Sequence, residues 1–199
     1  MTSHTNNDGH SSSGRERISQ AAYELFSRDG TQSVGIDAVI AHAGSAKMTL
    51  YRNFRSKDEL ILDFLRRREQ LWTRDWLQAE AQKRGHTPQA RLLAIFEVFG
   101  EWFADPDFDG CAFLTTMIEI KDPESPVRQA SVQHLANIRE FIKALAAEAG
   151  IADTDAFARQ WHILMKGSIM AAHEGDLAAA RRARGLGVLL LRSHGLDVE

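Results

Sequence analysis

Apolar residues recur every three or four positions through most of this chain, which is the spacing of an amphipathic helix. The first such segment covers residues 15–28, and its apolar face is formed by Ile18, Ala21, Ala22, Leu25 and Phe26. The sequence has no strand-like alternation of any length. The pattern therefore predicts an all-α protein whose first helix needs further helices to cover its apolar face.

Two short helices and a tight turn are predicted next. The first of these two short helices covers residues 37–43 and ends at Gly44, because glycine adopts the left-handed conformation of a helix cap at low cost. The second begins at Lys47 and places Leu50 and Phe54 one turn apart on its inner face. A helix, a short turn containing glycine and a second helix form a helix-turn-helix. Together with the first helix, they predict a three-helix bundle.

The outer face of the second short helix suits contact with DNA. Cations, hydroxyls and amides bind phosphate oxygens and base edges in the major groove, and this face carries Lys47, Thr49, Tyr51, Arg52 and Asn53. Met48 has the phase of the same face, where it would contact a thymine methyl; the alternative is that it packs against the first helix. Tyr51 follows the inward-facing Leu50, so the alternative for Tyr51 is a place in the core.

A long helix is predicted for residues 57–84. Ser56 is expected to be its N-cap, and the spacing to Glu59 matches a capping box. At about 1.5 Å per residue this helix would span roughly 40 Å, which is more than the small bundle needs, so we expect it to enter a second domain. Further apolar periodicity predicts helices over 89–103, 112–120, 127–149, 154–172 and 176–191.

The distribution of charge supports a local site for DNA. The chain of 199 residues has a net charge of −3, which argues against a protein that coats nucleic acid over its entire surface. Between Gly44 and Arg68, however, seven basic residues face three acidic ones. We therefore expect a basic patch beside the second short helix.

Cysteine content and hydropathy bear on the compartment. Cys111 is the only cysteine, so no internal disulfide is possible, and we expect Cys111 to be a small buried residue. No apolar run approaches the roughly 18 residues of a membrane span. Residues 1–14 are polar, lack the apolar core of a signal peptide and are expected to be a disordered arm. We therefore expect a cytoplasmic protein without a membrane partner.

Residues 18–64 contain a series of positions in a fixed order: Ala21-Ala22, Leu25-Phe26, Gly30, Val34, Ile36, Ala43-Gly44, Lys47, Thr49-Leu50-Tyr51, Phe54 and Ser56-Lys57-Asp58-Glu59-Leu60. In these positions the segment resembles the TetR family of one-component transcriptional regulators. The rest of the chain resembles the family in architecture, which implies a helical ligand-binding domain ending in two dimerisation helices. We therefore expect an N-terminal arm over 1–14, a DNA-binding domain over 15–60, and a larger helical ligand-binding and dimerisation domain over 61–199.

The resemblance also implies a function. Such a protein is a homodimer that binds double-stranded DNA at an inverted-repeat operator, and we expect a repressor that a small, largely hydrophobic effector releases. One alternative is a helical-bundle enzyme or metal protein with an incidental helix-turn-helix. The metal-binding spacings Glu-x-x-His and His-Glu-x-x-His occur at none of the eight histidines, so we expect no enzyme, metal or cofactor. A further alternative is a DNA-binding protein whose sensor domain is vestigial.

Family roles carry over to several residues of the helix-turn-helix. Thr49 and Tyr51 match hydroxyls that bind phosphates, and Lys57 matches a lysine that grips the DNA backbone at the start of the fourth helix. The candidates near base edges are Lys47, Met48 and Arg52.

Two positions depart from the family where a helix cap is usual. Ser45 stands in place of an apolar residue, and Ala46 stands in place of a capping Ser or Thr. The cap of the recognition helix is therefore either missing or supplied by Ser45. Ser33 is placed to cap the preceding helix. The residues expected at the DNA are Ser33, Ser45, Lys47, Met48, Thr49, Tyr51, Arg52 and Lys57.

Aromatic and methionine residues are abundant in the second part of the chain, as in apolar pockets between helices. The alternative is that they form core packing. Glu119 and His162 stand in apolar surroundings, where each would orient a ligand or be a satisfied buried polar residue. The candidate ligand-binding residues are Phe99, Trp102, Phe113, Met117, Glu119, Trp161, His162 and Met165.

Overall fold

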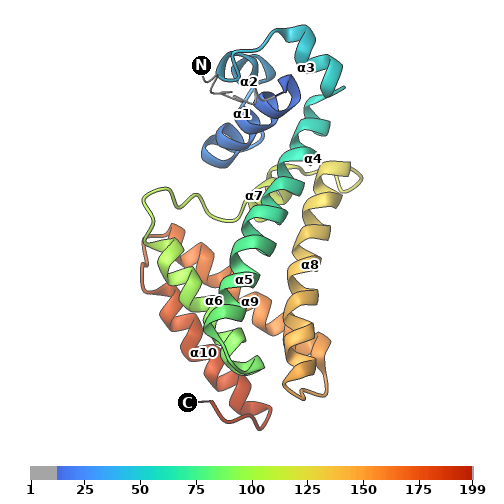
Figure 1. Cartoon of the computed structure of the whole chain (residues 1–199). Coiled ribbons are helices and arrows are strands. Elements are labelled where there is room, and N and C mark those ends of the chain that lie inside the picture. Colours follow the sequence, from blue (N-terminus) through green and yellow to red (C-terminus); the bar gives the residue numbers. More distant parts are fainter. Residues whose placement is uncertain (1–12, 199) are drawn as a thin grey trace, which may run out of the picture. The chain divides into compact units, whose positions relative to one another are not determined.

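A computed structural model describes residues 13–198, and this part of the chain is helical with no strand (Figure 1). The all-α prediction is confirmed. The helices are α1 Gly14–Asp29, α2 Ile36–His42, α3 Lys47–Asn53, α4 Lys57–Arg68, the π-helical segment η1 Glu69–Gln78, α5 Ala79–Arg84, α6 Pro88–Phe103, α7 Ala112–Glu119, α8 Pro126–Glu148, α9 Thr154–His173 and α10 Ala179–Ser193. Residues 1–12 of the expected disordered arm lie outside the described residues, whereas residues 13 and 14 were wrongly included in it, since Ser13 is the N-cap of α1 and Gly14 its first residue.

Contacts divide the chain into two compact units, and the division falls after Phe64. In unit 1, helices α1, α2 and α3 pack together, and the first residues of α4 complete the core. The ring of Phe64 contacts Phe26 at 5.6 Å and Tyr23 at 5.7 Å between centroids. Leu50 and Phe54 are fully buried, as the spacing of the recognition helix predicts.

The predicted long helix over 57–84 is confirmed, since α4, η1 and α5 follow one another without a break. Only one half of its predicted capping box is present, because the Glu59 carboxylate reaches the residue before Ser56 rather than Ser56 itself. Ser56 Oγ accepts from the Glu59 N–H at 3.1 Å, while the Glu59 carboxylate accepts from the Arg55 N–H at 2.7 Å. The central stretch, however, is a π-helix of ten residues, which the helical periodicity did not predict.

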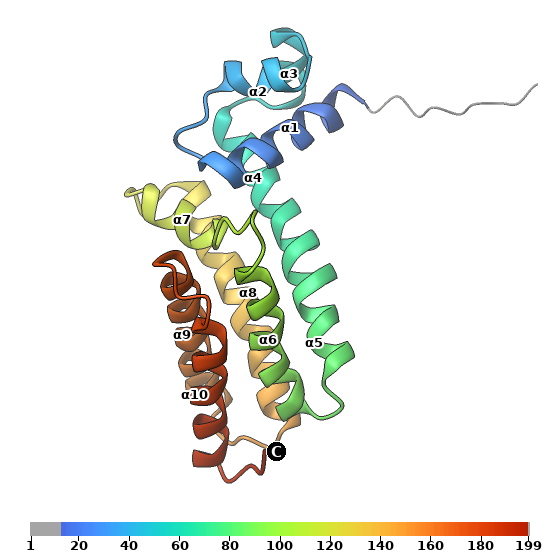
Figure 2. The same ribbon diagram turned by 90° about the vertical axis from the view of Figure 1, so that its left-hand side faces the viewer.

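Unit 2 is a bundle in which α6, α8, α9 and α10 lie side by side, with α5 against α6 and α7 against α8 (Figure 2). Its core contains the fully buried rings of Phe96, Phe157 and Trp161. Gly187 lets the indole of Trp161 approach the backbone of α10, because a Cβ there would lie 2.8 Å from Cη2 of Trp161.

Two details of unit 2 differ from expectation. Helix α10 begins at Ala179, three residues later than expected, because the Asp176 side chain accepts from the Ala178 N–H at 3.0 Å and stabilises a turn there. Cys111 is half-buried rather than buried, and desolvation raises the pKa of its thiol. Among the described residues, no helix has the length and apolar content needed to cross a membrane.

Candidate nucleic-acid interface

The side chains of α3 separate into a buried face and an exposed face. Leu50 is fully buried, whereas Met48 is 71% and Tyr51 45% exposed. The alternatives that placed Met48 against the first helix and Tyr51 in the core are therefore wrong. Both side chains lie on the face that the sequence assigns to DNA, together with the exposed Lys47 and Arg52.

Lys47 on this face and Lys57 at the start of α4 already have partners in the protein. Lys47 Nζ lies 3.1 Å from Asp37 Oδ1, and both side chains are exposed. The hydrogen bond to Asp37, followed by its charge, raises the pKa of Lys47. Lys57 Nζ donates to the carbonyl oxygen of Gln32 at 3.3 Å. Exposed contacts of this kind are weak, so both ammonium groups are available to a phosphate.

The predicted Ser33 cap is wrong, and of the two alternatives for the cap of α3 the structure has the missing cap. Helix α2 begins at Ile36, and its N-cap is Gly35, without a side-chain hydrogen bond, so Ser33 lies two residues too early in an exposed turn. The N-cap of α3 is Ala46, also without a side-chain bond, and the buried Ser45 Oγ has no hydrogen-bond partner. The roles of Ser33 and Ser45 at DNA stay predictions.

An arginine that the sequence did not single out holds the end of α3. Arg15 Nη1 donates to the Asn53 carbonyl at 3.1 Å, and Nη2 lies 2.8 Å from Asp63 Oδ1. Its guanidinium also stands over the ring of Phe54, 4.4 Å from the centroid. Arg15 and Asp63 are 48 positions apart, so helical spacing gives no signal for this contact.

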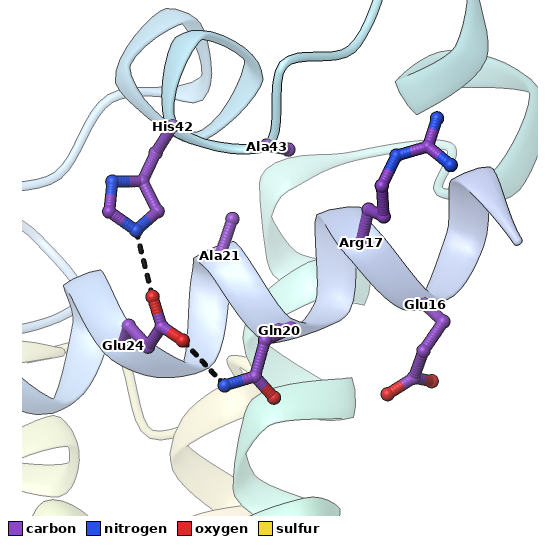
Figure 3. A pocket seen from close by; sticks show the side chains of 7 residues that line it. All are labelled: Glu16, Arg17, Gln20, Ala21, Glu24, His42 and Ala43. Atoms are coloured by element: carbon purple, nitrogen blue, oxygen red, sulfur yellow. Dashed lines mark hydrogen bonds and ion pairs between the residues drawn. The ribbon is translucent and has the colours of Figure 1, made fainter. Parts of the chain in front are cut away.

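A hollow of about 250 Å³ lies between α1 and α2 (Figure 3). In its lining, Glu24 accepts from Gln20 Nε2 at 2.6 Å and lies 2.8 Å from His42 Nε2. The lining mixes both signs of charge, and the described residues hold no group of three His, Cys, Asp or Glu side chains arranged for a metal ion. The hollow is lined by Glu16, Arg17, Gln20, Ala21, Glu24, His42 and Ala43.

Six of the eight candidate ligand residues are buried in unit 2. Their rings contact one another and neighbouring rings: Phe99 and Trp102 lie 5.6 Å apart, and Trp161 stacks on Phe157 at 5.4 Å. This packing is a core arrangement, and their contact with a ligand stays a prediction. The buried ones are Phe99, Trp102, Phe113, Trp161, His162 and Met165, while Met117 and Glu119 are half-buried.

His162 is buried without a hydrogen bond to Nδ1. Desolvation, followed by the charges of Lys166 and Arg139, lowers its pKa to about 3. The imidazole is therefore neutral at physiological pH. Its unpaired nitrogen differs from the satisfied polar residue that the sequence offered as an alternative.

A polar cluster at the start of η1 was not predicted from the sequence. His134 Nδ1 lies 2.7 Å from Glu69 Oε2, and Asn137 Nδ2 donates to Glu69 Oε1 at 2.7 Å. The imidazole of His134 stacks on Phe113 with 5.0 Å between centroids, and burial lowers the pKa of His134. In contrast to the Glu69 carboxylate, two buried polar atoms of η1, Trp72 Nε1 and Thr73 Oγ1, have no hydrogen-bond partner.

Comparisons with known proteins agree with this arrangement. The family model "Bacterial regulatory proteins, tetR family" matches residues 18–64, and "Tetracyclin repressor-like, C-terminal domain" matches residues 88–186. A comparison with curated proteins finds no match.

Solved structures extend the similarity over nearly the whole chain. A Streptomyces avermitilis protein assigned to the TetR transcriptional regulators is 31% identical, with a TM-score of 0.83, over 94% of this chain and 100% of its own. A TetR-family transcriptional regulator from Streptomyces coelicolor is 29% identical, with a TM-score of 0.83, over 92% and 96%. One from Cytophaga hutchinsonii, at 18% identity and a TM-score of 0.76 over 93% and 95%, shares the fold. The chain belongs to the TetR family and is a DNA-binding transcriptional regulator.

Proposed function

We propose that this regulator is a ligand-responsive repressor. It binds an inverted-repeat operator as a homodimer, and a small, largely hydrophobic effector releases it. The observation that carries the proposal is the division of α3 into two faces: its outer face is polar and cationic, and its inner face is apolar and fully buried. This helix belongs to a chain of the TetR family. Its place of action is the cytoplasm, and it catalyses no reaction and needs no cofactor.

The exposed apolar side chains of the last two helices support the homodimer. Large hydrophobic residues are exposed on α9 and α10, where they repeat at helical spacing. A two-fold axis through such a surface brings the same residues of both subunits together. A symmetric dimer then presents two copies of α3, the proposed reading helix, to two inverted half-sites. The residues concerned are Ile163, Met170, Leu186 and Leu189.

Unpaired polar atoms in unit 2 support an effector. Buried polar groups without a partner are few in native proteins, and each needs an explanation such as a missing water or ligand. Unit 2 has several among its aromatic rings, and π-helical turns such as η1 are frequent at functional sites. An effector acts only through its different affinity for the DNA-bound and released states.

The proposed reading helix is tested with single substitutions. Tyr51→Phe and Lys57→Ala remove a phosphate contact each, so we expect them to weaken binding to all duplexes, with a salt slope lower by about 0.9 for Lys57→Ala. Lys47→Ala and Arg52→Ala are expected to change the preferred sequence as well. Fluorescence anisotropy at several salt concentrations, with a duplex enriched by the parent protein and a scrambled one, measures the loss of affinity and the change of preferred sequence.

Lys83→Ala is the matched control, because this exposed lysine lies on α5. It is expected to bind DNA like the parent protein. The reading helix is assigned wrongly if the Tyr51 and Lys57 variants also keep the parent's affinity and salt slope.

A further inference from the structure

The guanidinium of Arg15 joins three parts of unit 1. It donates to the last carbonyl of α3, pairs with Asp63 on α4 and covers the ring of Phe54. We propose that Arg15 is a positioning residue, which fixes the C-terminal end of the reading helix and so sets how well the protein discriminates between DNA sequences. The inference rests on the proposed function, since α3 must read DNA for its position to matter.

Helix α3 needs support from outside, because it has only seven residues. Isolated helices shorter than about 12–15 residues are marginal in water. Its N-terminal end has no side-chain cap, and the Lys47–Asp37 pair there is exposed to solvent. The orientation of α3 therefore depends on the buried Leu50 and Phe54 and on whatever holds its last turn.

The last turn of α3 is held by hydrogen bonds on both sides of Asn53. The backbone carbonyl of Asn53 accepts from Arg15, and the side-chain Nδ2 of Asn53 donates to the Thr49 carbonyl at 2.8 Å. The Phe54 N–H donates to the Leu50 carbonyl at 2.8 Å. A cation at this end also interacts favourably with the helix dipole. The contact of Arg15 thus leads, through Asn53, to the turn that carries Thr49, Tyr51 and Arg52.

Asp63 fixes the guanidinium itself. Its carboxylate receives Arg15 Nη2 at 2.8 Å and Ser19 Oγ at 2.6 Å. The side chain of Asp63 is 17% exposed and that of Arg15 47%. Lysine cannot replace arginine here, because one ammonium group cannot reach a carbonyl and a carboxylate in a planar fork and also stack on a ring. Asp63, being an anion, makes no favourable contact with a phosphate.

The test compares sequence discrimination in four variants: Arg15→Lys, Arg15→Met, Asp63→Asn and, as control, Arg28→Met. Arg28 is an exposed arginine of the same helix, paired with its neighbour Asp29. A duplex is first enriched from random sequences with the parent protein. Anisotropy titrations then give the affinity for that duplex and for a scrambled one at several salt concentrations, and circular dichroism at the same temperature confirms that each variant is folded.

We expect the first three variants to lose about tenfold in affinity for the enriched duplex, the equivalent of one misread base pair. Their affinity for the scrambled duplex and their salt slopes are expected to match those of the parent. A residue that only stabilised the fold would lower the melting temperature and leave the ratio of the two affinities unchanged. Arg28→Met is expected to change neither affinity nor ratio.

Three results would overturn the inference. If Arg15 bound a phosphate directly, Arg15→Met would weaken binding to both duplexes and lower the salt slope by about 0.9. Asp63→Asn would then leave both affinities unchanged. If the folded variants keep the parent's affinity ratio, the inference about Arg15 is wrong, while the proposed function of the protein still stands. If the parent enriches no sequence, the proposed function fails and the inference fails with it.

Discussion

Replacing Leu189 by glutamate is expected to convert the dimer into monomers and to weaken operator binding by about a hundredfold or more. The reason is avidity, since linking two half-site contacts in one molecule strengthens binding by about 10²–10⁴. Leu189 is 61% exposed on α10, and Ile163 is 62% exposed on α9. A carboxylate buried against its symmetry mate without a partner would cost more than the apolar contact it replaces. Ile163→Glu is expected to act in the same direction.

Light scattering at micromolar concentration measures the mass of each variant, and a mobility-shift assay measures its operator affinity. Ile118→Glu is the matched control, because Ile118 is 63% exposed but lies on α7. It is expected to remain a dimer with full affinity. A parent protein that is monomeric, or a dimeric Leu189→Glu variant, would contradict the assignment of this surface.

Acidification is expected to destabilise the protein through His162. The unfolded chain gains a proton near the ordinary pKa of 6.5, whereas the buried imidazole stays neutral until its pKa of about 3. Between these values the unfolded state binds more protons, so the free energy of unfolding decreases as the pH falls. From pH 7 to pH 5 this single group accounts for about 2 kcal/mol.

Urea unfolding at pH 7 and pH 5 measures this loss in the parent and in His162→Leu. The leucine variant is expected to be at least as stable at pH 7, because an unsatisfied buried nitrogen is removed, and to lose about 2 kcal/mol less at pH 5. His134 contributes in the same direction and is unchanged in both proteins. His86→Gln, at an exposed position, is the control. Equal losses in the parent and His162→Leu would show that His162 is not the acid-sensitive group.

Helical periodicity predicted the elements of this fold well, because each helix buries one continuous apolar face. The segments predicted over 15–28 and 57–84 correspond to α1 and to the helix from α4 to α5. Helix ends were harder, since a cap depends on which residue first leaves helical geometry. Gly35, rather than Ser33, is the N-cap of α2. The buried residues of the π-helical segment η1, Thr73 and Leu77, are four positions apart, a spacing that an α-helix also has, so the sequence gives no distinct signal for η1.

The candidate site was predictable where it depends on the phase of one helix. The exposed position of Met48 follows from its phase, two residues before the buried Leu50, whereas Tyr51 directly follows Leu50 and its exposure was settled only by the structure. The contact of Arg15 with Asn53 and Asp63 was not predictable, because it joins three helices through one side chain. Likewise, the unpaired atoms of Trp72 and Thr73 depend on packing that no sequence spacing reveals.

Enrichment of DNA from a pool of random duplexes tests the central claim most directly. The parent protein, incubated with the pool at moderate salt, is expected to retain duplexes that contain an inverted repeat. The centres of the two half-sites should lie about 34–36 Å apart along the duplex, or a multiple of this, because both reading helices must enter the major groove on one side. Enrichment of no motif, or of a motif without inverted symmetry, would contradict a dimeric operator-binding repressor that reads DNA through α3.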